Sequence, residues 1–167
     1  MHMVGGSIRQ AFGVLVVPLQ ENMGWNPASV TLAYSLASIV GAVVAPLSGV
    51  ATDRFGPRKV VLVGIVFFFL GAMATGGVSR VWHIWLAYGV FLGLAQACFS
   101  VPIITAATYW FRNRLGVGIG LLHAAHGLGP AVMAILLSVM LAAFDWKATF
   151  WLMGGAGSII MVGLVLF

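Results

Sequence analysis

Long apolar runs joined by short turns constrain this chain more than any other feature. Two of them, Ala28 to Val50 and Val60 to Val78, are each close to the about 20 residues that an α-helix needs to cross a bilayer core. The charged segment Gly49 to Lys59 joins them. Charged residues make up 7% of the chain, against about 25% in a soluble domain. The sequence therefore predicts an all-α integral membrane protein.

Six membrane spans are predicted in a single domain covering residues 1–167, at residues 3–20, 28–50, 60–78, 84–109, 115–142 and 148–167. The basic residues of the short loops gather on one side of the predicted topology, namely Arg54, Arg58, Lys59, Arg112 and Arg114, with Arg80 and Lys147 opposite. The positive-inside rule then places the loops after the second and fourth spans in the cytoplasm. The predicted location is a multi-pass position in a bacterial inner (plasma) membrane.

Composition and motifs exclude several function classes. The net charge is +5, yet the basic residues are scattered among span ends and form no stripe interleaved with aromatic residues, which argues against nucleic-acid binding. Cys98 is the single cysteine, so the sequence contains no disulfide or cysteine metal framework. It also contains no nucleophile–base pair and no phosphate-cradling loop. We expect no enzyme, no cofactor and no metal site.

Asn26-Pro27-Ala28 permits two interpretations. The tripeptide occurs in water channels, which also have six spans, but that fold needs two copies and this sequence has one. Alternatively, Asn26 is a helix N-cap and Pro27 occupies the first helical position, where its missing N–H has no cost. The sequence favours the capping interpretation.

Small residues recur at every fourth position in three spans. In lipid, such rows mark helix faces that approach closely. We therefore expect the second, fourth and fifth spans to be interior and the third and sixth to face lipid. The first and fourth spans are expected to line a cavity. The rows are Gly41, Ala45, Gly49; Gly89, Gly93, Ala97; and Gly116, Gly120, Ala124.

The segment Gly49-x-x-x-Asp53-Arg54-x-Gly56-x-Arg58-Lys59 resembles the loop between helices 2 and 3 of the major facilitator superfamily of secondary transporters. Other segments are similar to its monocarboxylate and oxalate–formate exchanger-like branch. They are Phe12-Gly13-Val14, Pro18 to Glu21, Gly24-Trp25, Trp110 to Arg114 and Asp145-Trp146-Lys147.

This resemblance implies a twelve-helix fold, of which this chain supplies the N-terminal six helices as two inverted three-helix repeats. The chain is thus expected to be a fragment or a half-length product that needs the C-terminal half or a second copy. The implied function is transport of small organic anions such as monocarboxylates, with or without a proton, by alternating access. The alternative is a non-transporting membrane subunit or sensor that keeps this scaffold.

The resemblance also implies gating for the loop residues Gly49, Asp53, Arg54, Gly56, Arg58, Lys59 and Arg112. Asp53 can pair with Arg58 or Arg112, and Gly56 permits a sharp turn. Helix kinks are expected at Pro46, Pro102, Gly129 and Pro130. The family's antiporter pattern is only partly present, because Ala125, Met133 and Ala134 stand where glycines are expected, so antiport is not supported.

Arg9 is the leading candidate for substrate binding. At about 1.5 Å per residue it lies about 18 Å from Glu21, slightly past the middle of the core. An ionisable residue there costs at least about 2.5–3.5 kcal/mol and suggests a function. A guanidinium can offer paired donors to a carboxylate substrate. Alternatively, Arg9 flanks a shorter first helix and snorkels to the headgroups.

Further polar candidates lie on three spans. His123 and His126 are three residues apart and can bind an anion, relay a proton or simply bond a neighbouring helix. Tyr34 and Gln96 can orient a ligand. The acidic residues are Glu21, Asp53 and Asp145, all predicted at membrane surfaces. Protons must then travel with the substrate, use a histidine or be handled by the second half.

Overall fold

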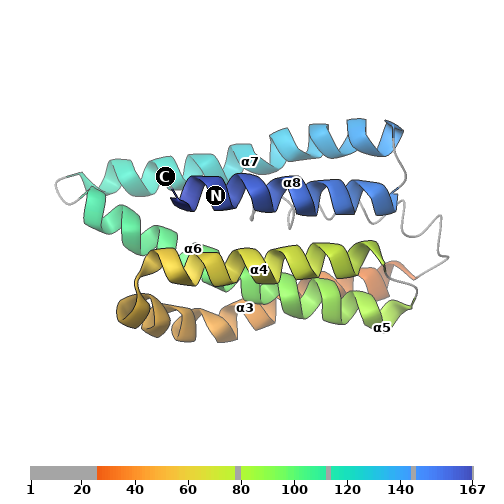
Figure 1. The fold of residues 1–167 in the computed structure, drawn as a ribbon, viewed down its shortest axis with the longest axis horizontal. Coiled ribbons are helices and arrows are strands. Elements are labelled where there is room, and N and C mark those ends of the chain that lie inside the picture. The colour runs from red at the N-terminus through yellow and green to blue at the C-terminus, as the bar shows by residue number, and fades with distance from the viewer. Residues whose placement is uncertain (1–25, 78–79, 112–113, 144–145, 167) are drawn as a thin grey trace.

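The computed structural model describes residues 26–77, 80–111, 114–143 and 146–166, and every regular element in them is helical (Figure 1). One continuous helical run consists of α5, the π-helical segment η1 and α6. The elements are α3 (Pro27–Phe55), α4 (Pro57–Gly76), α5 (Val81–Ile84), η1 (Trp85–Leu92), α6 (Gly93–Trp110), α7 (Leu115–Ala143) and α8 (Trp146–Leu166).

Within this part of the chain, four helical stretches are long and apolar enough to cross a membrane, and α8 adds a shorter apolar stretch, Trp151–Val165. The four are Thr31–Phe55, Pro57–Gly76, Val81–Trp110 and Gly116–Met140. Helices therefore occupy five of the six predicted spans, while the span at residues 3–20 lies outside the described residues. The helix expected at residues 3–20 and the inverted three-helix repeat therefore stay predictions.

The ends of α3 form as the local sequence predicts. The Asn26 side chain accepts a 3.0 Å hydrogen bond from the Ala28 N–H, and Pro27 occupies the first helical turn. The capping interpretation of Asn26-Pro27-Ala28 is therefore confirmed. At the other end, Gly56 separates α3 from α4 with φ 86° and ψ 155°, a conformation open to glycine and to almost no other residue.

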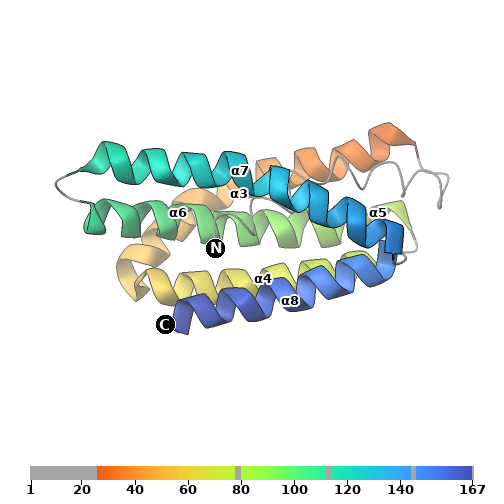
Figure 2. The ribbon, with the colours of Figure 1, turned by 90° about the horizontal axis from the view of Figure 1, so that it is seen from above.

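The helix α4 is the centre of the described bundle. It lies beside α8 and also packs against α6 and η1, while α3 packs across α6 and η1 (Figures 1 and 2). The largest fully buried side chains come from six different elements, Ile84 of α5 among them, and they belong to one core. They include Phe68, Tyr88, Phe99, Leu137 and Met161.

The central position of α4 contradicts the prediction that the third span faces lipid. Half of its apolar window is buried, against 17% for α3 and 6% for α7. Glycines on α4 explain the close packing: a Cβ on Gly64 would lie 2.8 Å from the Cys98 Cβ, and one on Gly71 would lie 3.2 Å from the Ala87 carbonyl oxygen. The sixth span is mixed, because α8 packs on α4 but leaves Ile159 75% exposed.

Two of the three predicted small-residue rows contact each other. A Cβ on Gly41 of α3 would lie 3.5 Å from the Gly93 carbonyl oxygen of α6, and one on Gly93 would lie 2.8 Å from the Ala37 carbonyl oxygen. The prediction that these rows mark closely packed faces is therefore confirmed for the second and fourth spans, and the structure shows that the two faces pack on each other. The row on α7 differs, because Gly116 and Gly120 have no described atom within 4 Å of an added Cβ.

Candidate functional site

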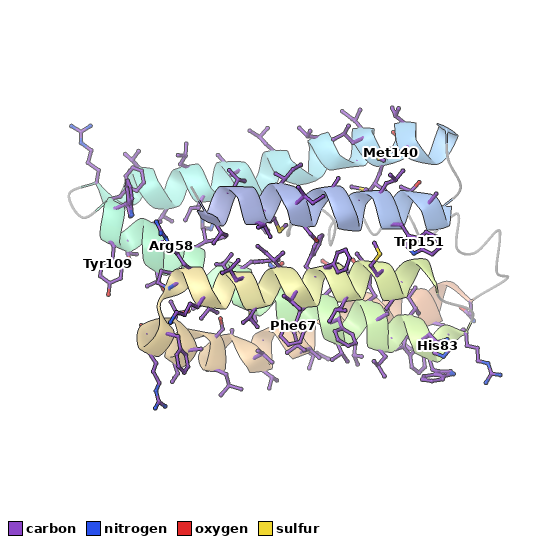
Figure 3. The ribbon with its side chains drawn as sticks, viewed as in Figure 1. Arg58, Phe67, His83, Tyr109, Met140 and Trp151 are labelled. Carbon is purple, nitrogen blue, oxygen red and sulfur yellow. The ribbon has the colours of Figure 1, made fainter. Side chains whose placement is uncertain are left out.

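The charged loop lies at one end of the bundle. Asp53 and Arg54 end α3, and Arg58 and Lys59 begin α4, with all four side chains exposed. Figure 3 shows Arg58 at the same end as Tyr109, whereas His83 and Trp151 lie at the opposite end. The positive φ of Gly56 makes the connection short, so the basic side chains stay close to the helix ends.

The predicted partners of Asp53 are only partly tested. Among the described residues, Asp53 makes no ion pair within 4.0 Å, so the expected pairing with Arg58 is not formed in this structure. Arg112, the other predicted partner, lies outside the described residues. The Arg54 guanidinium instead lies 5.7 Å from the centre of the Phe55 ring.

Tyr34 and Gln96 lie on different helices of the predicted cavity. Tyr34 of α3 is half-buried and packs against the core. Gln96 of α6 is also half-buried, and its side-chain amide has no hydrogen-bond partner among the described residues. Its backbone carbonyl oxygen accepts a hydrogen bond from Ser100 Oγ. Both side chains stay candidates for ligand binding, and Tyr34 also packs against the core.

The two histidines of α7 have different environments. His123 is exposed, and its Nδ1 lies 3.1 Å from the Ile119 carbonyl oxygen of its own helix. His126 is half-buried on the side of α7 that also carries the buried Gly129. Arg9, the leading candidate, lies outside the described residues. The structure therefore distributes the described candidates over α3, α6 and α7, and their binding role stays a prediction.

Most hydroxyl groups inside the helices bond their own backbone. Ser38, Ser100 and Thr105 each donate to a carbonyl four residues earlier. Ser48 differs from these hydroxyl groups, because its Oγ donates a 2.9 Å hydrogen bond to the Ala97 carbonyl oxygen of α6. Ser48 is 3% exposed and fixes the α3–α6 contact. In the sequence, the signal for this contact is that Ser48 lies next to Gly49, a member of the small-residue row of the second span.

The predicted kink residues all lie inside continuous helices: Pro46 in α3, Pro102 in α6, and Gly129 and Pro130 in α7. Figure 2 shows α7 changing direction near its middle. Pro102 is buried, whereas Pro46 is exposed. Whether these positions move during function is untested.

The π-helical segment of the fourth span was not anticipated from the sequence. Trp85–Leu92 is apolar throughout and indicates an ordinary helix. Single π turns occur often at functional sites. At its start, the Trp85 indole N–H donates a 2.8 Å hydrogen bond to the Ser29 carbonyl oxygen, which joins the first turns of α3 and η1.

Three grooves on the described bundle were also missed. One lies between α4, α6 and α8, one between α3, α4 and α6, and one near Trp82 and His83. None of the three is lined by Tyr34, Gln96, His123 or His126. Arg58 lines the first groove and Lys59 the second. Two residues of the charged loop therefore face apolar grooves on the bundle surface.

Comparison with known proteins gives a consistent set of relatives. The chain is similar to human monocarboxylate transporter 11, with 25% identity over 87% of this chain and 31% of the relative. It is 30% identical to mouse monocarboxylate transporter 10, over 80% of this chain and 26% of the relative. A riboflavin transporter of Saccharomyces cerevisiae is 27% identical over 75% of this chain and 24% of the relative.

These matches span between about a quarter and a third of each relative's length. The sequence profile described as Major Facilitator Superfamily matches residues 1–167. The long apolar helices and the glycine turn between α3 and α4 agree with that match. The chain belongs to the Major Facilitator Superfamily and is similar to its monocarboxylate transporter members.

Proposed function

We propose that this chain forms the N-terminal six-helix half of a secondary transporter that moves small organic anions, such as monocarboxylates, by alternating access. The observation that carries the proposal is the superfamily match over residues 1–167, together with relatives named as monocarboxylate transporters. The cavity of such a transporter lies at the interface between repeats. The other wall of the cavity therefore comes from a C-terminal half or a second copy.

In this proposal Arg9 binds the carboxylate of the substrate. A guanidinium presents two parallel donors to a carboxylate, and this geometry selects anions over neutral solutes. The half-buried Gln96 amide orients the rest of the ligand, which is consistent with its lack of a hydrogen-bond partner among the described residues. Tyr34, His123 and His126 complete the polar lining.

The charged loop acts as the cytoplasmic gate. Asp53, Arg58 and Lys59 are exposed at the end of the bundle, so they are available to the second half of the transporter. Gly56 holds the turn in a conformation with φ 86° that keeps these charges together. Rocking of the two halves then makes and breaks contacts at this loop.

Proton coupling has few candidate groups in this chain. Asp53 is the acidic residue that the structure describes, and it lies at the exposed end of α3. The proton therefore travels with the substrate, through a histidine of α7 or through the second half. The relatives reported above come from eukaryotes and give no support for a bacterial inner membrane.

Uptake into liposomes tests the proposal. The chain, completed by a C-terminal half, is reconstituted and supplied with labelled lactate, formate, oxalate or riboflavin. Anion uptake that Arg9→Gln abolishes and Arg9→Lys only partly restores supports the anion proposal. Uptake of riboflavin without uptake of the anions would show that the proposed substrate class is wrong. Binding of a solute without any uptake would favour the sensor alternative.

A histidine variant tests the proton path in the same assay. His126→Ala is expected to change how uptake depends on pH, because a histidine changes charge near neutral pH. His123→Ala is the matched comparison, since His123 is exposed and its Nδ1 contacts its own helix. An unchanged pH dependence in both variants would remove the histidines from the mechanism.

A further inference from the structure

An apolar groove with a volume of about 340 Å³ lies between α4, α6 and α8 at the charged end of the bundle. Its floor is buried, with Val61, Pro102 and Val165. Its rim is exposed and includes Arg58, Trp110 and Leu164. The lining residues that the structure describes are Pro57, Arg58, Val61, Pro102, Ile103, Ala106, Trp110, Leu164 and Val165.

The position of this groove determines what can fill it. Its walls belong to three apolar helices, two of which are long enough to cross a membrane. An apolar groove on such a surface faces hydrocarbon chains, and these fit it better than water does. The polar end lies where α4 begins and α6 ends. The ends of helices that cross a bilayer lie near the lipid headgroups.

The polar end of the groove favours a negative charge. Arg58 is a guanidinium at the rim, and guanidinium groups bind phosphate through paired hydrogen bonds. The first N–H groups of α4 have no side-chain cap, so the positive end of the helix dipole adds to this charge. Trp110, which is 89% exposed, is the kind of ring that lies at the headgroup level.

We infer that this groove, here called the Arg58 groove, binds an anionic phospholipid of the surrounding leaflet. One acyl chain lies along Ile103, Ala106 and Leu164, and the phosphate contacts Arg58. The proposal does not depend on the transported substrate, because none of the candidate substrate residues that the structure describes lines the groove.

Two neighbouring cations provide matched controls. Lys59 lines a different groove, of about 370 Å³, between α3, α4 and α6. Arg54 lines neither groove and lies over the Phe55 ring. If anionic lipid is attracted only by the general positive charge of this end, Arg54, Arg58 and Lys59 should contribute equally. A specific lipid site at the Arg58 groove requires that replacing Arg58 reduces lipid binding more than replacing Arg54 or Lys59 does.

The experiment measures lipids that remain bound to the purified chain by native mass spectrometry, after equilibration with equal amounts of phosphatidylglycerol and phosphatidylcholine. We expect phosphatidylglycerol to be retained preferentially. Arg58→Gln should weaken this preference by about fivefold, the effect of removing one basic residue near an anionic surface. Arg54→Gln should leave it almost unchanged.

A phosphatidylglycerol with a photoreactive group in its acyl chain locates the site independently. Labelling should fall on Ile103, Ala106 or Leu164, and Ala106→Phe should reduce it by filling the groove. Circular dichroism of each variant establishes that the helices are intact, and Lys59→Gln repeats the measurement with the labelling expected to persist.

Several outcomes would overturn the inference. Equal retention of the two lipids would exclude selection of an anionic headgroup. If Arg54→Gln reduced the lipid preference as much as Arg58→Gln, the attraction would come from the general positive charge of this end of the bundle. Displacement of the lipid by inorganic phosphate alone would point to an anion site without an acyl chain. Crosslinking of the groove to a second copy of the chain would identify a protein interface instead.

Discussion

Gly41 of α3 and Gly93 of α6 bring two helix backbones into close contact, since a Cβ on Gly41 would lie 3.5 Å from the Gly93 carbonyl oxygen. A Cβ on Gly93 would itself lie 2.8 Å from the Ala37 carbonyl oxygen and 3.0 Å from the Val40 Cβ. The opposing atoms belong to backbone or to a stiff side chain and cannot move aside. The α3–α6 seam therefore depends on glycine.

Gly93→Val is expected to separate α3 from α6 and to reduce the free energy of unfolding by about 1–3 kcal/mol, the usual cost of overpacking. Thermal unfolding in detergent measures this loss. Gly155→Val on α8 is the control, because none of the atoms that the structure describes lies within 4 Å of a Cβ at Gly155. Equal losses in the two variants would show that valine itself, and not the seam, causes the effect.

Ser48→Ala is expected to weaken the same seam by removing a hydrogen bond between helices. Ser48 Oγ lies 2.9 Å from the Ala97 carbonyl oxygen, and such bonds in membrane proteins contribute about 0.6–2 kcal/mol. Ser158→Ala removes an equally buried hydroxyl that bonds the Gly154 carbonyl oxygen of its own helix. Ser158→Ala should therefore cost much less, and a comparable loss of stability would contradict the assignment.

Gly56→Ala is expected to strain the turn between α3 and α4. The backbone at Gly56 has φ 86° and ψ 155°, and a residue with a side chain held there costs about 1–3 kcal/mol. Gly77→Ala is the matched control, because Gly77 ends α4 at φ −95° and a Cβ there would be 3.7 Å from its nearest neighbour. Unfolding of both variants in detergent tests the difference, and equal stability would show that the turn relaxes.

Parts of this fold follow directly from local sequence patterns. Asn26 caps α3, Gly56 forms the turn, and the small-residue rows that contain Gly41 and Gly93 lie on closely packed helix faces, as their four-residue spacing predicts. The central place of α4 cannot be predicted from the sequence in the same way. Lipid tails are as apolar as leucine side chains, so hydropathy does not separate a helix that faces lipid from one that packs against other helices. The contacts of Gly64 with Cys98 and Phe99 reveal it only in three dimensions.

The candidate site is harder to predict for the same reason. Tyr34, Gln96 and His126 lie on α3, α6 and α7, and their relative positions depend on how these helices cross. The positions of these residues along their predicted spans indicate a polar lining, but they do not indicate which side chains contact one another. The apolar segment Trp85–Leu92 likewise gives no sign of its π-helical conformation.

Trp85→Phe is expected to loosen the ends of α3 and η1 opposite the charged loop without disturbing the core. The Trp85 indole N–H donates a 2.8 Å hydrogen bond to the Ser29 carbonyl oxygen, and the net contribution of such a bond is about 0.5–1.5 kcal/mol. Hydrogen exchange should therefore accelerate in the first turns of α3. Trp82→Phe is the control, because the Trp82 ring packs against the His83 ring at an angle of 52°, with the ring centres 4.0 Å apart, and phenylalanine can keep this contact. Faster exchange confined to Trp85→Phe would confirm that this single bond joins the second and fourth spans at that end, and equal exchange in both variants would assign the coupling to aromatic packing alone.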